Sequence, residues 1–329
     1  MYTVNRLPHL LSSLLGKVRR NGTRFTLMLS VMMAAGFILS YLLIEARLND
    51  VAHSATGETS LARGVASPTA TTITVNDPGE TVANDGKCTL REAIVAANTN
   101  TISGAMTGEC AAGMAGADMI VFSLGSGTPT INLTSPLPTI TEPITIKGNS
   151  GGATRVELNG AGAGASANGL RVTAGNSTIL RLVINRFTGN GILISGTGFN
   201  TIKGCLIGTD AVGTISSANN IGIEIRGSSD NSIGGVALGD RNVISGNTGA
   251  GILIAYDTTN TLAASRNKVI GNFIGIDVNG RVDLGNGGFG VDIVGGNIST
   301  IGGSTEAARN IISGNNGGGV KISTSNASS

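Results

Sequence analysis

The 329-residue chain contains no tryptophan and only three tyrosines, and charged residues make up 13% of it. It shows neither a Gly-X-Y period nor long heptads, which excludes collagen and a coiled coil. Both histidines, His9 and His53, lie near the N-terminus. Because the rest of the chain lacks histidine, histidine-based general base catalysis, Ser-His-Asp triads and most transition-metal sites are excluded there.

Glycine and asparagine are abundant instead. The chain contains 51 glycines and 30 asparagines, which together make up about a quarter of its length, whereas glycine usually accounts for roughly 7%. Frequent Ile, Val and Leu exclude a simply disordered chain. This composition is typical of a chain that turns often and buries small apolar residues between the turns, so it favours a repetitive β architecture.

The positive charge is concentrated at the N-terminus. Residues 1–50 carry six basic and two acidic residues, whereas the remainder carries 16 basic and 18 acidic residues. A net charge of −2 beyond residue 50 gives no electrostatic reason to expect a nucleic-acid partner.

A leader precedes the remainder of the chain. Residues 1–24 form a basic segment, which is expected to stay in the cytoplasm. Residues 25–44 form an uncharged apolar run that is long enough to cross a bilayer as a helix. This run is either an uncleaved transmembrane signal anchor or the core of a cleaved signal peptide. Both alternatives predict export, to the cell envelope or as a secreted protein, and residues 45–72 are predicted to be a flexible linker.

Export would place the three cysteines in an oxidising environment, where disulfides form. Cys88 and Cys110 enclose 21 residues, and we predict that they pair. A loop of that size would stabilise the fold by roughly 3 kcal/mol. Cys205 lies in an apolar strand pattern and is predicted to be a small buried residue.

The last third of the chain repeats itself, in blocks that recur in the same order. Residues 200–210 match residues 267–277, and residues 241–254 match residues 309–322. Short β-branched runs that end at Gly, Asn or Asp predict short strands. We interpret each repeat as three coils of about 22–23 residues in a parallel β-solenoid, and residues 118–329 as about nine coils.

Two features of the repeat predict how its turns are held. Asn242 and Asn310 occupy equivalent positions, as do Asn247 and Asn315, and stacked amides at equivalent turns would hydrogen-bond along a ladder. The repeat also places an aspartate at the end of two equivalent runs, IGTD and IGID, and these residues, Asp210 and Asp277, are predicted to close turns through their side chains.

A solenoid exposes an apolar first coil, which must be covered. The segment 88–98, CTLREAIVAAN, is a candidate cover, because Thr89 and Glu92 have the spacing of a helical capping box. Its apolar residues share one helix face: Leu90, Ala93, Ile94 and Ala97. We expect this face to lie over the first coil, with Arg91 facing solvent or an acidic partner. The C-terminal coil is likewise expected to be covered, by further chain or by a partner.

The segment 88–98 resembles the motif of the CSLREA domain, which lies near the N-terminus of exported, mostly bacterial proteins, with Thr89 in place of the usual serine. Residues 118–149 are similar to the first coils that follow that motif, and the Asn- and Gly-rich blocks resemble right-handed parallel β-helix repeats of the pectin-lyase-like superfamily. The resemblance implies an N-terminal cap at residues 73–117 and a right-handed parallel β-helix at residues 118–329. It implies no activity, and no catalytic residue is carried over.

Two classes of function remain open. A long regular surface favours an envelope-associated, adhesin-like binding or structural module, with polysaccharide as the expected partner. The alternative is a polysaccharide lyase or glycoside hydrolase of the pectin-lyase-like type, because that fold hosts many such enzymes. A hydrolase would require an acidic pair assembled across coils, and lyases of this fold often use an arginine or lysine base. The candidate groups are Asp210, Asp230, Asp257, Asp277, Asp283, Asp292, Glu224, Arg181, Arg226 and Arg241.

Nothing in the sequence assigns these groups a reaction. They form no adjacent acidic pair and match no lyase or hydrolase motif, so no catalytic, cofactor or metal residue is predicted, and calcium has no support. Aromatic residues that would stack on sugars are also scarce, because phenylalanines at repeat-equivalent positions are expected in the core. The sequence therefore favours binding over catalysis.

Overall fold

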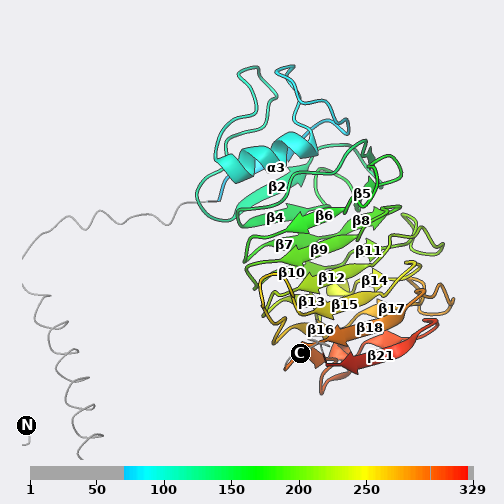
Figure 1. Ribbon diagram of the computed structural model, residues 1–329. Coiled ribbons are helices and arrows are strands. Elements are labelled where there is room, and N and C mark those ends of the chain that lie inside the picture. Colours follow the sequence, from blue (N-terminus) through cyan, green and yellow to red (C-terminus); the bar gives the residue numbers. More distant parts are fainter. Residues whose placement is uncertain (1–69, 297, 325–329) are drawn as a thin grey trace, which may run out of the picture. The chain divides into compact units, whose positions relative to one another are not determined.

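The computed structural model describes residues 70–296 and 298–324. The predicted basic segment and apolar span lie outside the described residues, as does nearly all of the predicted linker. Among the residues that are described, no helix is both long and apolar enough to cross a bilayer. The strands form three parallel sheets, which the chain visits in turn as it winds along one axis (Figure 1). The protein is therefore a parallel β-solenoid.

The first sheet has eight strands and the second has seven. The first consists of β1 (Thr72–Val75), β2 (Asp118–Phe122), β4 (Ile144–Lys147), β7 (Thr178–Leu180), β10 (Thr201–Lys203), β13 (Ser232–Gly234), β16 (Lys268–Ile270) and β19 (Thr300–Ile301). The second consists of β3 (Thr130–Asn132), β5 (Val156–Asn159), β8 (Leu182–Asn185), β11 (Leu206–Ile207), β14 (Val243–Ile244), β17 (Phe273–Ile274) and β20 (Ile311–Ile312).

The third sheet has six strands. These are β6 (Leu170–Val172), β9 (Ile192–Ser195), β12 (Ile223–Arg226), β15 (Ile252–Ala255), β18 (Phe289–Val294) and β21 (Gly318–Ser323). The helices of the described residues are α3 (Leu90–Thr99) and two short 3₁₀ turns, η2 (Leu238–Asp240) and η3 (Glu306–Ala308). Residues 70–117 are called the cap below, and residues 118–324 the solenoid.

Aliphatic columns fill the interior of the solenoid. In the first sheet Ile146, Ile179, Ile202 and Ile233 pair in register and are all buried. Their neighbours along each strand point outward, because successive side chains of a strand alternate between its two faces. The alternation of apolar and polar residues in the sequence therefore fixes which residues form the core.

The number of coils differs from the prediction. Thr201 pairs with Ser232, and Ser232 pairs with Lys268, which is the equivalent of Thr201 in the next sequence repeat. Each sequence repeat therefore contains two coils, and the predicted three are wrong. From β2 to β19 the first sheet has seven strands, so the predicted nine coils are also wrong. One coil, from Thr178 to Thr201, has the predicted length.

Loops outside the second sheet explain this two-coil period. Short antiparallel bridges close one loop between Thr209 and Ser216 and another between Ile276 and Asp283. These loops cover a second apolar cluster on the outer face of the sheet: Val183, Leu206, Val243, Phe273 and Ile276. The later loop also bonds to the earlier one across two coils. Because a loop on every second coil covers the coil between, the sequence repeats every two coils.

Asparagine ladders hold the turns, as predicted. In each ladder one side-chain amide donates to the next amide oxygen at 2.7–3.2 Å. The predicted Asn242 and Asn310 are joined through Asn272, and Asn247 and Asn315 are joined through Asn286. A third ladder runs through Asn200, Asn231 and Asn267. These buried amides satisfy backbone groups that the turns leave without partners.

The last described rung remains uncovered within residues 70–296 and 298–324. Val320 and Ile322 are 46% and 74% exposed, whereas Val291 and Ile293, their partners in β18, are nearly completely buried. The expectation that further chain or a partner covers this rung stays a prediction.

Candidate functional site

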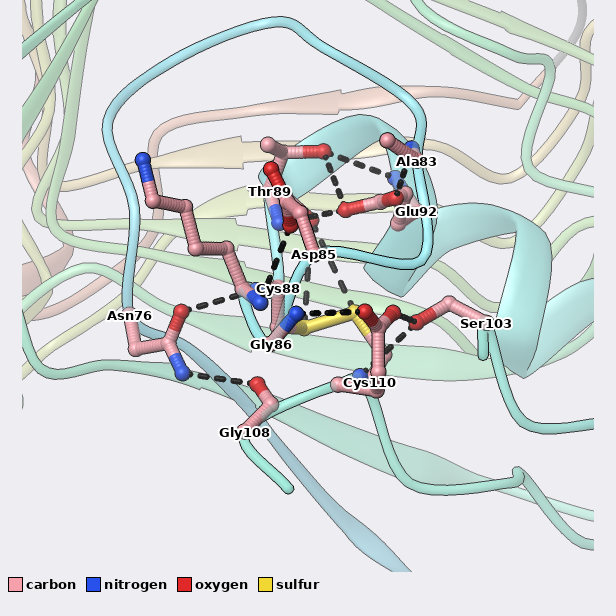
Figure 2. Close-up of a disulfide and its surroundings, with 12 residues drawn as sticks. Asn76, Ala83, Asp85, Gly86, Cys88, Thr89, Glu92, Ser103, Gly108 and Cys110 are labelled. Atoms are coloured by element: carbon pink, nitrogen blue, oxygen red, sulfur yellow. Dashed lines mark hydrogen bonds between the residues drawn. A yellow bond between two sulfur atoms is a disulfide. The ribbon is translucent and has the colours of Figure 1, made fainter. Parts of the chain in front are cut away.

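The cap is built around the residues that the sequence singled out. Cys88 and Cys110, which were predicted to pair, are joined by a disulfide with 4.8 Å between their Cα atoms (Figure 2). Thr89 is the N-cap of α3 and forms the expected capping box with Glu92. The backbone N–H of Thr89 donates to the Glu92 carboxylate at 2.9 Å, and the N–H of Glu92 donates to the Thr89 hydroxyl at 3.3 Å.

Helix α3 lies across β1 and β2, at one end of the solenoid (Figure 1). Its apolar face is completely buried: Leu90, Ala93, Ile94 and Ala97. These side chains belong to the same core as Ile73 of β1 and Ile120 of β2. The face that the sequence indicated therefore seals the first rung.

Of the two alternatives expected for Arg91, solvent is wrong and an acidic partner is found, which is Glu80 of the same chain. Only 15% of its side chain is exposed, and it forms an ion pair with Glu80 at 2.5 Å. It also donates to the backbone carbonyl of Pro136 at 2.7 Å. The loop after β3 rises over the helix and supplies this acceptor, so Arg91 binds the cap to the solenoid.

The other polar groups of the cap hold its loops. Asn76 accepts from the N–H of Cys88 at 2.7 Å and donates to the carbonyl of Gly108 at 2.8 Å (Figure 2). The Glu109 carboxylate accepts hydrogen bonds from the Ser103 hydroxyl and from the N–H of Gly86. Both bonds lower the pKa of Glu109, and the bond from Ser103 has the larger effect. These side chains bind their own chain and thereby hold the loops of the cap in place.

Asp210 and Asp277 close the two loops outside the second sheet, as predicted. The Asp277 carboxylate accepts from the N–H groups of Val282 and Arg281 at 2.9 and 2.7 Å. These bonds lower its pKa to about 2. Asp210 accepts from the N–H groups at the same places in the earlier loop. A shallow hollow, lined by Asp277, Asn279, Arg281 and Val282, lies within the later loop itself.

The remaining candidate acids lie apart or are paired. Asp230 forms an ion pair with Arg266, and Glu224 forms one with Arg226, each at 2.6 Å. In the described part of the chain, no three His, Cys, Asp or Glu residues are placed to hold a metal ion. The three candidate arginines do not share one face. Arg226 ends β12 in the third sheet, whereas Arg181 directly precedes β8 and Arg241 lies two residues before β14 in the second.

A row of hydroxyl groups crosses the outer face of the first sheet. Thr145, Thr178, Thr201 and Ser232 pair consecutively and are half-buried. Neighbouring members are therefore separated by the strand spacing of about 4.8 Å. Throughout the described ranges, none of these four hydroxyls hydrogen-bonds to another protein group. This hydroxyl row is a flat polar surface, and no loop of the described chain forms hydrogen bonds with its hydroxyl groups.

The corner beside the hydroxyl row has a positive φ in five successive rungs. The residues are Asn176, Phe199, Asp230, Arg266 and Ile298, with φ between 54° and 64°. Each lies two residues before the corresponding row position. Phe199 is 61% exposed there, although a phenylalanine in this conformation is strained and asparagine is better suited. Its exposure corrects the expectation that such phenylalanines are core residues, which holds for Phe122 and Phe187.

Lysines lie along the opposite edge of the hydroxyl row. Lys147 and Lys203 pair with Leu180 from either side, so the three side chains form one outward column. Lys203 also forms an ion pair with Asp240 at 3.0 Å. The exposure of Phe199 could have been predicted from the sequence, because the residue at the equivalent position of the next repeat, Arg266, is polar.

Comparison with models of known protein families and with curated protein sequences finds no match. The resemblance of segment 88–98 to the CSLREA motif therefore rests on those residues alone.

Proposed function

We propose that the protein is an exported, envelope-associated binding module that holds an extended polysaccharide against the outer face of its first sheet. The hydroxyl row is the observation that carries the proposal. Serine and threonine hydroxyls both donate and accept hydrogen bonds, and sugar hydroxyls require both. A row that repeats at strand spacing suits an extended polymer lying along the solenoid axis.

Exposed Phe199 supports the same surface. Its ring is an apolar platform at the edge of the row, and the apolar face of a sugar ring would pack against such a platform. The strain of its backbone has no explanation in the packing, because most of the side chain contacts solvent. Strained residues cluster at binding sites, which favours a role in binding.

Export and the finer fold belong to the same proposal. The apolar segment 25–44 would anchor the chain with its N-terminus in the cytoplasm, or be cleaved from a secreted protein. The Cys88–Cys110 disulfide suits an oxidising compartment. The CSLREA-like motif and the repeats support a right-handed parallel β-helix of the pectin-lyase-like kind.

The test is a polysaccharide panel. Full-length protein in mild detergent is subjected to affinity electrophoresis in gels that contain pectin, alginate or neutral glucans. In parallel, the protein is incubated with each polysaccharide, and the mixtures are assayed for new reducing ends and unsaturated products. Retention without turnover supports the proposal. Turnover would instead establish the lyase or hydrolase alternative.

A matched pair of variants locates the surface. Thr178→Val combined with Thr201→Val removes two row hydroxyls but keeps β-branched side chains, so retention should fall several-fold at an unchanged melting temperature. Thr258→Val, on an exposed loop, should change neither property. Equal retention by the double variant and the wild type would contradict the proposed surface.

A further inference from the structure

Two arginines lie at the corner between the first and second sheets. Arg155 directly precedes β5 and Arg181 directly precedes β8. Because Val156 pairs with Leu182, the two arginines hold the same position in consecutive rungs. The following rungs place these residues at the same position: Gly204, Arg241, Gly271 and Arg309.

The two side chains converge on the next rung. Arg155 donates from Nε to the carbonyl of Gly204 at 3.3 Å. The Arg181 side chain lies against Gly204 and Gly239, and a Cβ added at either glycine would collide with it. Gly204 and Gly239 thus form a cradle for the Arg181 side chain. The backbone carbonyl of Gly204 is also the group that accepts from Arg155 Nε.

Neither guanidinium has an acidic partner within the described residues. Arginines elsewhere do have one, as in the pairs Arg266–Asp230 and Arg226–Glu224. The acid nearest along the chain to this cradle, Asp240, binds Lys203. Both arginines are half-buried, and burial, followed by the positive charge of Arg181, lowers the pKa of Arg155. Two like charges held together in this way favour an anion as their partner.

Arg181 also occupies a position suited to glycine. Its φ is 55°, and the two glycines at this corner position, Gly204 and Gly271, have φ of 64° and 71°. A residue with a side chain is strained in this conformation, whereas glycine is not. The local backbone conformation therefore does not favour an arginine at this position, and no ion pair within residues 70–296 and 298–324 offsets the strain.

We propose that Arg155 and Arg181 bind an anionic group of the polymer, so that the polysaccharide is acidic. This inference rests on the proposed function and names its ligand class. Arginine forks bind carboxylate, sulfate and phosphate groups through paired hydrogen bonds. Lys147 adds a positive charge along the same edge of the hydroxyl row, whereas the charge of Lys203 is paired with Asp240.

The experiment compares polymers that differ in charge. Full-length protein in mild detergent is titrated with polygalacturonate, dextran sulfate, dextran and inorganic polyphosphate, at low and high sodium chloride. Wild-type protein should bind polygalacturonate and dextran sulfate, bind uncharged dextran at least tenfold more weakly, and lose affinity as salt increases.

Arg181→Gly is the decisive variant. It should fold with the wild-type melting temperature or a higher one, because glycine already occupies this position in other rungs. It should weaken binding of acidic polymer about tenfold, as expected from the loss of a charged hydrogen-bonding partner. Arg155→Gln should weaken binding similarly. Arg171→Gln removes the same charge from an exposed position on β6 and should stay within about twofold of wild type.

The outcomes separate the two proposals. Equal binding of dextran and dextran sulfate, or unchanged binding by both arginine variants, overturns the anion site and leaves the polysaccharide module standing. Binding of polyphosphate alone supports the anion site and overturns polysaccharide as its ligand. Absence of binding to every polymer tested overturns both.

Discussion

Asparagine has different roles in the two parts of the protein. In the cap, Asn76 holds one particular pair of loops by binding the backbone of Cys88 and Gly108. In the solenoid, Asn231 accepts from one neighbouring rung and donates to the amide oxygen of Asn267 in the next. The cap contact occurs once, whereas the ladder contact recurs from rung to rung.

This difference predicts how many neighbouring elements a destabilising substitution should affect. Each rung of a solenoid contacts only its neighbours, so its stability is approximately a sum of rung and interface contributions. A defect inside a ladder affects rungs on both sides. A defect in the cap affects one helix, its loops and the first rung. Substitutions in the two parts should therefore differ in their effects, and the largest effect is expected inside a ladder.

Asn231→Ala should destabilise the solenoid by about 3–5 kcal/mol, because it removes several buried hydrogen bonds together. The N–H and side-chain amide of Asn200 lose their acceptor, and the Asn267 oxygen loses a donor. The free energy of unfolding in urea measures the effect. Asn220→Ala, at an exposed position, is the control and should change it by less than about 0.5 kcal/mol. Similar values for both variants would contradict the role of the ladder.

Replacing Cys88 and Cys110 together by alanine should lower the free energy of unfolding by about 3 kcal/mol, because it frees a long loop in the unfolded chain. Hydrogen exchange should quicken at cap amides such as those of Gly86 and Ala105, with little change in β10 to β15. Equal quickening in both parts would show that the cap and the solenoid open as one unit.

The buried thiol of Cys205 should make the stability of the solenoid depend on pH. Burial raises the pKa of its thiol from 9.0 to about 11. The unfolded chain therefore ionises first, and the stability present below pH 9 is lost as pH rises towards 11, by about 2 kcal/mol. Urea unfolding of the wild type and Cys205→Ala across this range isolates the effect. A constant difference between the two proteins would contradict it.

The smallest effect is expected at the corner beside the hydroxyl row. Phe199→Asn should raise the free energy of unfolding by about 1 kcal/mol, since asparagine tolerates a positive φ. The same change should weaken retention by polysaccharide. The reverse change one rung earlier, Asn176→Phe, should cost a similar amount of stability. A less stable Phe199→Asn variant would show that the ring contributes to packing.

The strands and the core followed from local patterns in the sequence. Apolar alternation marked inward residues such as Ile202 and Ile225, and the capping box marked the start of α3. The number of coils did not follow, because the residues of the loops closed by Asp210 and Asp277 resemble those of a further rung. Only the strand register separates a loop from a coil.

The candidate site was harder to predict for the same reason. One coil separates Arg155 from Arg181, but the coils of this solenoid differ in length. The coil that begins at Ser232 and ends at Lys268 is much longer than the one from Thr178 to Thr201. Side chains that share a column therefore have no fixed spacing in the sequence. The contact between Arg91 and the Pro136 carbonyl was not predicted, because this acceptor belongs to a loop that is distant in the sequence.

The corner with positive φ has a consequence for how such a protein changes over generations. Five consecutive turns there hold an amide, an aromatic ring, an acid, a base and an aliphatic group on nearly the same backbone. What is displayed at this corner is thus uncoupled from what keeps the chain wound. New recognition properties can arise there through single substitutions, while the scaffold beneath stays as it was.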